Sequence, residues 1–363
     1  MAAAARKARV GVIGAGTWAV HSHLPVLARR ADVELVAVCR LGAEELEAVR
    51  SRFGFELASE DYRDVTAAGL DVCLVCGPAG LHHEHTLAAL EAGAHVMVEK
   101  PFTLRVEDAW DLVDAATRLE RHLVVAYGYN YLDPVVEFER VLRERGGIGE
   151  IEQCMFAMHS CTRELLARGE PYPVDGEDVP DPDAATWTDP ALSGGGYGQA
   201  QLTHVLGLGL RLTGLHGDEA LALTAAPLGA PVELHDAIAL RYAEGAIGTL
   251  TGGSSWVGAD GSRDVVQLRA IGSRGQWELD LGHDVAWVFV DDGEGETRLA
   301  LPAGAGEYHC EGPPNEIVDL ALGLTASNRA PGELAAHTVE ILNAVYHSAA
   351  AGAPAAVTRR DRT

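Results

Sequence analysis

The sequence predicts a two-domain α/β protein in which a doubly wound parallel sheet precedes an α/β domain with a mainly antiparallel open sheet. Short apolar runs alternate with helical patterns over the first 126 residues, which is typical of βαβ units. From Ile151 the chain changes to long segments of alternating apolar and polar residues, separated by turn residues. Its 363 residues exceed one typical domain, so we predict domains at 1–126 and 127–363.

The elements of the first domain follow from their apolar patterns. Each predicted strand is a short continuous apolar run, and each predicted helix carries apolar residues at helical spacing. The expected strands cover residues 8–14, 33–39, 71–76, 95–99 and 122–127, and the expected helices cover residues 17–30, 43–53, 82–93 and 106–120.

The second domain begins with a helix that follows Leu132–Asp133–Pro134 and ends at Gly146–Gly147. The stretch between Arg163 and Ser193 is rich in proline, aspartate and glycine and is too long for an ordinary connection. It is either a loop that covers a substrate or a solvated insertion. Antiparallel strands are expected within 235–256, 264–272, 276–281 and 285–292, and helical stretches at 201–212 and 315–350.

Charge and composition disfavour several classes of partner. Lys and Arg total 28 against 53 Asp and Glu, which gives a net charge of −25. This field repels nucleic acid and anionic lipid, so we expect a small-molecule substrate and neither nucleic acid nor membrane as partner. No apolar run approaches the roughly 20 residues that span a bilayer, and the N-terminus lacks the pattern of a secretory signal.

The six cysteines do not indicate a disulfide framework in a chain of this length. Cys73 and Cys76 form a CxxC pair, but they lie in a predicted strand, where residues three apart point to opposite faces. This pair can therefore neither bridge nor hold one metal ion. We expect reduced thiols and a cytoplasmic protein.

The lysine content singles out one residue. Only Lys7 and Lys100 are lysines, whereas the other 26 basic residues are arginines. A guanidinium does not give up its proton in proteins, so a chain that otherwise uses arginine indicates a need for an amine at Lys100. Coding bias is the alternative explanation.

A glycine-rich motif joins the first predicted strand to the first predicted helix. Gly11, Gly14, Gly16 and Ala19 form the pattern G-x-x-G-x-G-x-x-A. Glycines in this context allow a tight turn, close approach of the backbone to a pyrophosphate, and close packing of the helix on the sheet. The motif therefore predicts a dinucleotide-binding Rossmann domain.

The end of the second predicted strand bears on the choice of cofactor. An acid about 20 residues after the glycines normally holds the ribose hydroxyls of NAD, but this position carries Arg40. An arginine suits a 2′-phosphate, so we predict NADP, with NAD as the alternative because Glu44 or Glu45 also lies within reach.

Glu99–Lys100–Pro101 directly follows the predicted strand at 95–99, which places Lys100 at the carboxyl end of a parallel strand. Ligands of doubly wound sheets bind at this edge, and a lysine that is shielded from water there can serve as a general acid/base. Together with the glycine motif, this Glu-Lys-Pro sequence resembles the Gfo/Idh/MocA family of oxidoreductases. Three further segments carry the resemblance: 78–101, 187–204 and 331–354.

The resemblance implies a Rossmann domain followed by an α/β domain that covers the active site and often builds dimers, so a homodimer or homotetramer is expected. It implies that Lys100 is the catalytic acid/base and that His204 is the histidine of the family pattern GGG-x-x-x-D-x-x-x-H. The aspartate position of that pattern holds Ala200, so the usual Lys/Asp/His set is incomplete. The cofactor contacts that we predict are Gly11, Gly14, Gly16, Thr17, Trp18, Arg40, Pro78, His82, Glu99 and Lys100.

The residues around this gap indicate the substrate. Family members commonly carry an arginine in the segment where this chain has Tyr127, Tyr129, Asn130 and Tyr131. Aromatic and amide groups suit a neutral polyol better than an acid. The predicted substrate contacts are Tyr129, Asn130, Trp187, Tyr197, Gln199, Gln201 and His204.

A metal site at His82, His83 and His85 is disfavoured, because these positions do not share one face of a helix. We expect no metal. The sequence predicts an NAD(P)-dependent dehydrogenase or reductase that acts on a hydroxyl-bearing carbon of a sugar, glycoside or cyclitol-like substrate. The alternatives are a redox-neutral lyase or glycosidase with a retained cofactor, and a non-catalytic dinucleotide-binding regulator.

Overall fold

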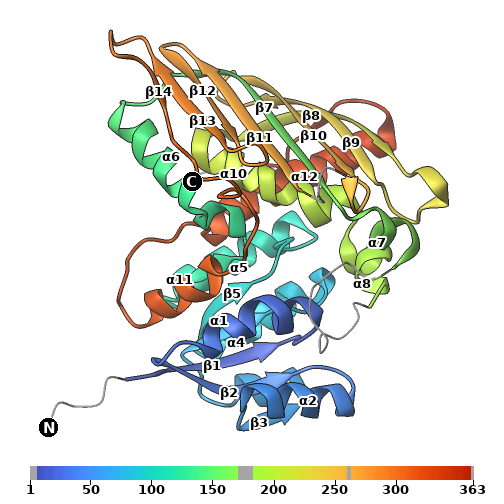
Figure 1. Cartoon of the computed structure of the whole chain (residues 1–363). Helices are drawn as coiled ribbons and strands as arrows, with labels where there is room; N and C mark the ends of the chain where they lie inside the picture. Colours follow the sequence, from blue (N-terminus) through green and yellow to red (C-terminus); the bar gives the residue numbers. More distant parts are fainter. Residues whose placement is uncertain (1–5, 171–182, 260–262, 361–363) are drawn as a thin grey trace, which may run out of the picture.

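The computed structural model describes residues 6–170, 183–259 and 263–360 of the chain (Figure 1). Within those residues the chain forms two sheets, one parallel and one mainly antiparallel, and each has its own apolar core. This arrangement confirms the predicted fold class.

The first sheet has the doubly wound strand order β3-β2-β1-β4-β5-β6, and all of its neighbouring strands are parallel. Because the order reverses between β1 and β4, the carboxyl ends of these two strands open onto the crevice where such sheets bind ligands. The strands are β1 (Ala8–Ile13), β2 (Val33–Cys39), β3 (Leu57–Ser59), β4 (Val72–Val75), β5 (His95–Val98) and β6 (Leu123–Val125).

Helices pack on both faces of this sheet. The first helical segment is less regular than predicted, because a π-helix at Ala19–His23 precedes α1 and Pro25 lacks the N–H that a continuous α-helix needs. The short β3 and α3 are missing from the prediction, since three or five residues are too few to show a period. The helices are α1 (Leu24–Ala28), α2 (Ala43–Phe53), α3 (Tyr62–Thr66), α4 (His82–Glu91) and α5 (Val106–Arg118).

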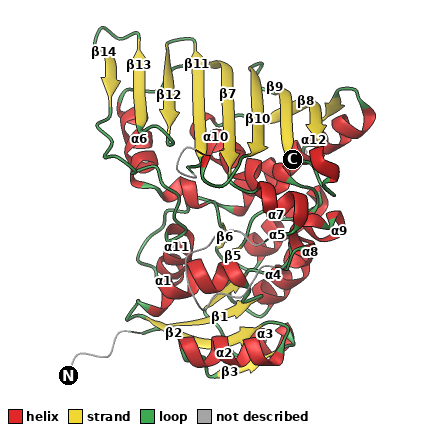
Figure 2. Ribbon diagram, turned by 45° about the vertical axis from the view of Figure 1, so that its right-hand side comes forward, coloured by secondary structure: helices red, strands yellow, loops and turns green. Residues whose placement is uncertain are grey.

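The second sheet has nine strands in the order β14-β13-β12-β11-β7-β10-β9-β8-β15 (Figure 2). Its neighbours are antiparallel except for β7 and β10. The strands are β7 (Ile151–Ser160), β8 (Gly217–Ala225), β9 (His235–Tyr242), β10 (Ile247–Ser254), β11 (Val265–Gly272), β12 (Gly275–Asp280), β13 (Val285–Val290), β14 (Gly295–Arg298) and β15 (Ala355–Ala356).

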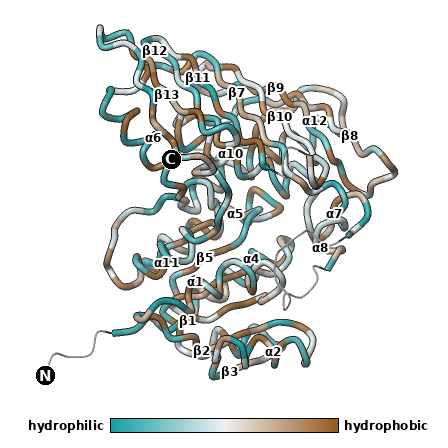
Figure 3. The backbone as a smooth tube through the Cα atoms, in the orientation of Figure 1, coloured by the Kyte–Doolittle hydropathy of each residue, from teal (hydrophilic) through white to brown (hydrophobic). Residues whose placement is uncertain are grey.

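One face of this sheet packs on α10 and α12, while the other faces outward (Figure 2). Buried and exposed residues alternate along β9, as expected for a strand with one solvated face. Figure 3 shows the resulting mixture of hydrophobic and hydrophilic residues along these strands. The helices are α6 (Asp133–Glu144), α7 (Arg163–Arg168), α8 (Ala185–Thr188), α9 (Pro190–Ser193), α10 (Thr203–Thr213), α11 (Gly312–Ala321) and α12 (Gly332–Ala351).

Two expectations for the second half need comment. The prediction of a single helical stretch at 315–350 is wrong, because two helices form there. Gly323 has a left-handed φ of 69°, and Pro331 precedes the first turn of α12. The expected substrate-covering loop between Arg163 and Ser193 lies in part outside the described residues, at 171–182.

The chain returns to the first core after it has built the second sheet. Ile317 and Val318 of α11, together with Ala335 of α12, are buried in the core of the parallel sheet. The backbone N–H of Val125 in β6 donates to Ala330 O at 2.8 Å. The C-terminal helices therefore fasten the two halves together, and the boundary at 126/127 stays a prediction.

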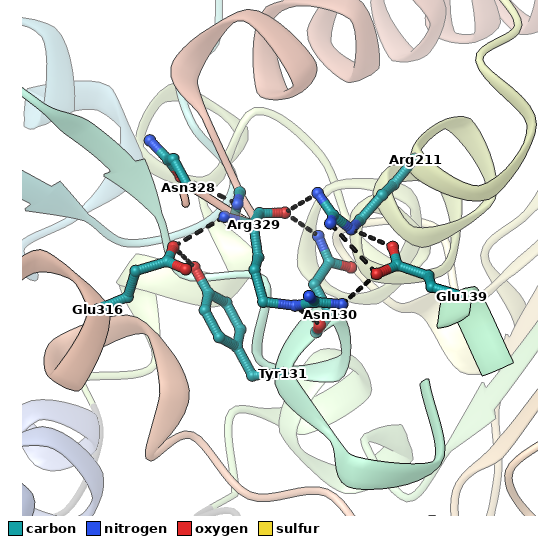
Figure 4. Close-up of polar contacts among 8 residues, drawn as sticks. Asn130, Tyr131, Glu139, Arg211, Glu316, Asn328 and Arg329 are labelled. Atoms are coloured by element: carbon teal, nitrogen blue, oxygen red, sulfur yellow. Dashed lines mark hydrogen bonds and ion pairs between the residues drawn. The ribbon is translucent and has the colours of Figure 1, made fainter. Parts of the chain in front are cut away.

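A network of charged and polar side chains lies where the two halves meet (Figure 4). Glu139 of α6 pairs with Arg211 of α10 at 2.5 Å and with Arg329 of the segment between α11 and α12. The backbone N–H of Arg329 donates to Glu316 Oε2 at 2.9 Å, and Tyr131 donates to the same oxygen. Arg329 thereby ties three helices to the segment that follows β6.

All six cysteines lie within the described residues and are free thiols, five of them buried. Among the described residues, no helix combines the length and the apolar character needed to cross a membrane.

One carboxyl group is buried in the second half of the chain without a hydrogen bond from the described residues. Asp236 of β9 is 3% exposed, and neither of its carboxyl oxygens has a hydrogen-bond partner among the described residues. Burial raises the pKa of Asp236 to about 8, and the nearby charge of Glu233 adds to the effect.

We therefore predict that Asp236→Asn stabilises the protein in a pH-dependent way. The folded-state pKa lies above the unfolded value of 3.8, so the stability linked to this carboxyl is present below about pH 4 and is lost as the pH rises toward about 8. Asparagine does not titrate, so the variant does not lose this stability. The difference in free energy of unfolding between the variant and the wild type therefore grows by at most about 1.4 kcal/mol per pH unit over that window. Urea unfolding of both proteins at several pH values measures it, and a constant difference would contradict the prediction.

Candidate functional site

The glycine-rich turn links β1 to the first helix. Gly14 has a φ of 83°, and its N–H donates to Cys39 O at the end of β2 at 2.9 Å. A Cβ at Gly14 would lie 2.4 Å from the nitrogen of Gly77, so a side chain does not fit there. Gly11 has a different role, because a Cβ there would collide with Leu70 inside the layer beside the sheet.

Two features of this turn leave room and a donor for a ligand. A Cβ built on Gly16 would meet no atom within 4 Å, so the backbone is open to a ligand at the beginning of the helix that carries Thr17 and Trp18. The indole Nε1 of Trp18 is buried and has no hydrogen-bond partner among the described residues. A buried donor without a partner calls for an acceptor that a ligand can supply.

The side chain of Arg40 turns back toward the glycine turn. Its Nη1 lies 3.4 Å from Ala15 O and its Nε lies 3.1 Å from Leu41 O. Glu44 and Glu45, the alternative ribose contacts, lie in the first turn of α2. The guanidinium thus stands beside the turn where the sequence predicts a phosphate.

Lys100 directly follows β5 and reaches the second domain. Its Nζ donates to Ala200 O at 2.8 Å and lies 5.6 Å from the ring centre of Trp187. Ala200 lies in a π-helical turn (Gly198–Leu202) that precedes α10, and such turns occur often at functional sites. Burial lowers the pKa of Lys100, while the charges of Glu99, Cys310 and Asp264 oppose this effect.

His204 in the first turn of α10 lies beside this amine. Burial, and then the charge of Lys100, lower the pKa of His204 well below its usual value, so the imidazole is neutral near pH 7. Its Nδ1 is buried without a hydrogen-bond partner among the described residues. The ring packs edge-on against Tyr129 and Tyr308, with centroid distances of 5.5 and 5.4 Å.

Glu99 is fixed from two sides. Its Oε1 lies 2.5 Å from His23 Nε2, and its Oε2 accepts from the backbone N–H of Lys100 at 3.0 Å. Burial opposes the ionisation of Glu99, but His23 and Lys100 outweigh it and hold its pKa below the usual range. Burial likewise opposes a charged His23, yet Cys310 and Glu99 raise its pKa to about 10. A buried ion pair therefore supports the backbone at Lys100.

His23, Glu99 and Cys310 also offer ligand atoms within 4.8 Å of one another. The Nε2 and Oε1 atoms that a metal ion would use already face each other at 2.5 Å. A protonated histidine does not ligate a metal, so the arrangement is that of a hydrogen-bonded ion pair.

The three histidines of the HHEH segment do not form a cluster. His82 is buried, and its ring nitrogens lie 2.8 Å from Pro101 O and 2.9 Å from Gly77 O. His83 pairs with Asp111, and His85 packs on Tyr62. His82 thus joins the end of β4 to the segment after Lys100, next to Pro78, which begins the turn at Ala79–Leu81.

The predicted substrate residues divide into two groups. Trp187 lies near Lys100 and Tyr129 packs against His204, whereas Tyr197 is buried in the core of the second sheet and donates to Met158 O at 3.1 Å. Gln199 and Gln201 lie in the π-helical turn with Ala200. Asn130 is placed elsewhere: its side-chain amide donates to Arg329 O at 3.1 Å in the network of Figure 4. This amide joins the two halves of the chain, and the predicted substrate contact at Asn130 stays a prediction.

Sequence reasoning missed four residues of the site. His23 lies in the first helical segment, Asp264 precedes β11, and Tyr308 and Cys310 lie in the connection that leads to α11. Tyr129 donates to Asp264 Oδ2 at 2.9 Å, and the Tyr308 ring stacks on Trp18 and packs at a tilt against Tyr129. No spacing rule relates these residues to Lys100, because the fold brings them together from distant segments.

Comparison with known proteins agrees with this geometry. Residues 8–127 match the model of an oxidoreductase family with an NAD-binding Rossmann fold, Gfo/Idh/MocA. D-glucoside 3-dehydrogenase of Escherichia coli K12 is 39% identical over 147 residues, which are 39% of this chain and 41% of that protein. The matched segment thus spans about two fifths of this curated relative.

Solved structures resemble the whole chain. An oxidoreductase domain protein from Kribbella flavida has a TM-score of 0.78 at 20% identity, over 98% of this chain and 100% of that one. Levoglucosan dehydrogenase in complex with NADH and levoglucosan has a TM-score of 0.77 at 20% identity and the same coverage. These similarities establish the fold of both domains. The dinucleotide-binding domain of this chain belongs to the Gfo/Idh/MocA family of oxidoreductases.

Proposed function

We propose that the chain is an NAD(P)-dependent oxidoreductase that transfers a hydride between the nicotinamide and a hydroxyl-bearing carbon of a sugar, glycoside or cyclitol-like substrate. The observation that carries this proposal is the position of Lys100. Its amine follows the carboxyl end of β5, in the same parallel sheet that carries the glycine turn, and acts on the neutral imidazole of His204.

The chain's own residues supply the proton chemistry. When bound, the nicotinamide supplies the hydride acceptor or donor. In the oxidation direction, the hydroxyl proton of the substrate passes to neutral Lys100 Nζ as the C–H hydride leaves and the C–O bond becomes a carbonyl. Burial of the amine favours its neutral form, and the neutral His204 can accept a hydrogen bond from a hydroxyl.

The substrate class follows from the residues beside Lys100. Tyr129, Tyr308 and Trp187 present aromatic rings, which suit the apolar faces and hydroxyl edges of a sugar ring. The named substrates of the relatives support the same class, since one acts on a D-glucoside and another was solved with levoglucosan.

For the cofactor, we predict tighter binding of NADPH than of NADH, because Arg40 lies beside the glycine turn and provides a cation for a 2′-phosphate. Arg40→Asp should reverse this preference. Fluorescence titration of the wild type and of Arg40→Asp with both cofactors measures this preference. Arg50→Asp, on the exposed part of α2, is the control. A wild-type protein that binds NADH as tightly as NADPH would refute the prediction. NADH is the alternative to test, because levoglucosan dehydrogenase was solved with NADH.

Lys100→Met is predicted to retain cofactor binding and to lower kcat by about 10²–10⁴, the usual range for the loss of a general acid/base. Lys7→Met is the matched control, because Lys7 is the other lysine of the chain and is exposed. Steady-state kinetics on an accepted sugar and a cofactor titration provide the two measurements. Wild-type turnover in Lys100→Met would refute the assignment and favour a dinucleotide-binding regulator.

His204→Ala is predicted to raise KM and to lower kcat by less than Lys100→Met does. The neutral imidazole positions a hydroxyl, whereas the amine exchanges the proton. The comparison of kcat/KM and kcat on one substrate tests the order of the two variants. If His204→Ala is the more damaging change, the two roles are reversed.

A further inference from the structure

A carboxylate from the second sheet reaches the site that Lys100 occupies. Asp264 stands immediately before β11, and its Oδ2 accepts from Tyr129 Oη at 2.9 Å. The Tyr129 ring packs edge-on against His204 at 5.5 Å and at a tilt against Tyr308 at 4.6 Å. Asp264 is thereby tied to the aromatic residues that surround His204.

The coupling between Asp264 and Lys100 is reciprocal. Burial raises the pKa of Asp264 to about 6, while Tyr129 and the charge of Lys100 oppose this rise. In turn, the charge of Asp264 opposes the lowering of the Lys100 pKa. Each group therefore lies in the electric field of the other, although they come from different sheets.

The other groups that face Lys100 do not make Asp264 redundant. Glu99 is held by His23 and by the backbone N–H of Lys100, and so lies on the side of the parallel sheet. The position opposite, in the turn that accepts the Lys100 hydrogen bond, carries Ala200 and offers only a carbonyl oxygen. The charged or titratable groups coupled to Lys100 are Glu99, Cys310, Asp264 and His204.

We propose that Asp264, which Tyr129 holds beside His204, is the carboxylate that acts on Lys100 from the side of the second domain, as a positioning residue for the amine. This role rests on the proposed function insofar as Lys100 exchanges the substrate proton. A carboxylate in this place completes the site from β11 instead of from the turn at Ala200.

The lysine content of the chain allows a direct test without substrate or cofactor. Selective isotope labelling of lysine gives NMR signals from Lys100 and Lys7, and Lys7 serves as the internal reference. In the full-length protein, Asp264→Asn should lower the Lys100 pKa by about one unit or more, because an opposite charge nearby is lost. Asp264→Glu should restore most of the difference.

Asp236→Asn is the matched control, since it makes the same change in β9 of the same sheet and Asp236 is not among the groups coupled to Lys100. It should leave the Lys100 titration at the wild-type value. Tyr129→Phe keeps the carboxylate but removes its tether, and should lower the Lys100 pKa by less than Asp264→Asn. This variant also preserves the test if Asp264→Asn fails to fold.

A Lys100 titration that is the same in wild type, folded Asp264→Asn and Tyr129→Phe would overturn the proposal. Kinetics then separate it from the proposed function. In the oxidation direction, the acidic limb of the kcat/KM profile should move to lower pH in Asp264→Asn, together with the Lys100 pKa. If turnover falls while the Lys100 pKa stays unchanged, Asp264 acts elsewhere and the proposal is wrong. If no sugar is oxidised, the proposed function fails, while the NMR titration still decides the role of Asp264.

Discussion

The hydrogen bond from Lys100 Nζ to Ala200 O, at 2.8 Å, is the contact on which the arrangement of the site depends. It joins the end of β5 in the parallel sheet to the turn before α10 in the second domain. A lysine that lies between two domains loses water, and its amine becomes easier to deprotonate than an exposed one. The contact therefore fixes the position of the amine, and the burial that accompanies it lowers the pKa of Lys100.

Charged residues on both sides of Lys100 limit the lowering of its pKa. The Glu99–His23 pair keeps a negative charge below Lys100 and fixes its backbone, and Asp264 lies in its field from the second sheet. His204, in contrast, has no carboxylate hydrogen bond among the described residues and is surrounded by aromatic rings, so it stays neutral. Different environments thus give adjacent titratable groups different roles.

The C-terminal helices hold the two domains in a fixed relative position. Because α11 and the first half of α12 are buried in the core of the parallel sheet, the second domain is attached at both of its ends. The network of Glu139, Arg211 and Arg329 in Figure 4 fixes the same junction with charged groups that are largely withdrawn from water. Removing one member of such a network leaves a partly buried charge without its partner, which is far costlier than losing a surface ion pair. The position of Ala200 relative to Lys100 is therefore set by the whole molecule.

The sequence by itself determined the parallel sheet, the glycine turn, the place of Lys100 at the end of β5, and the antiparallel character of the second sheet. These features depend on local patterns: strand periods, glycines before a helix, and short spacings along one segment. It failed for the break between α11 and α12 and for the short β3 and α3. Only the tertiary structure decided that His23 supports Glu99, that Tyr308 packs beside His204, and that Tyr129 donates to Asp264. The physical reason is that these contacts join residues 60 or more positions apart, and no local period records which distant side chains a folded core brings together.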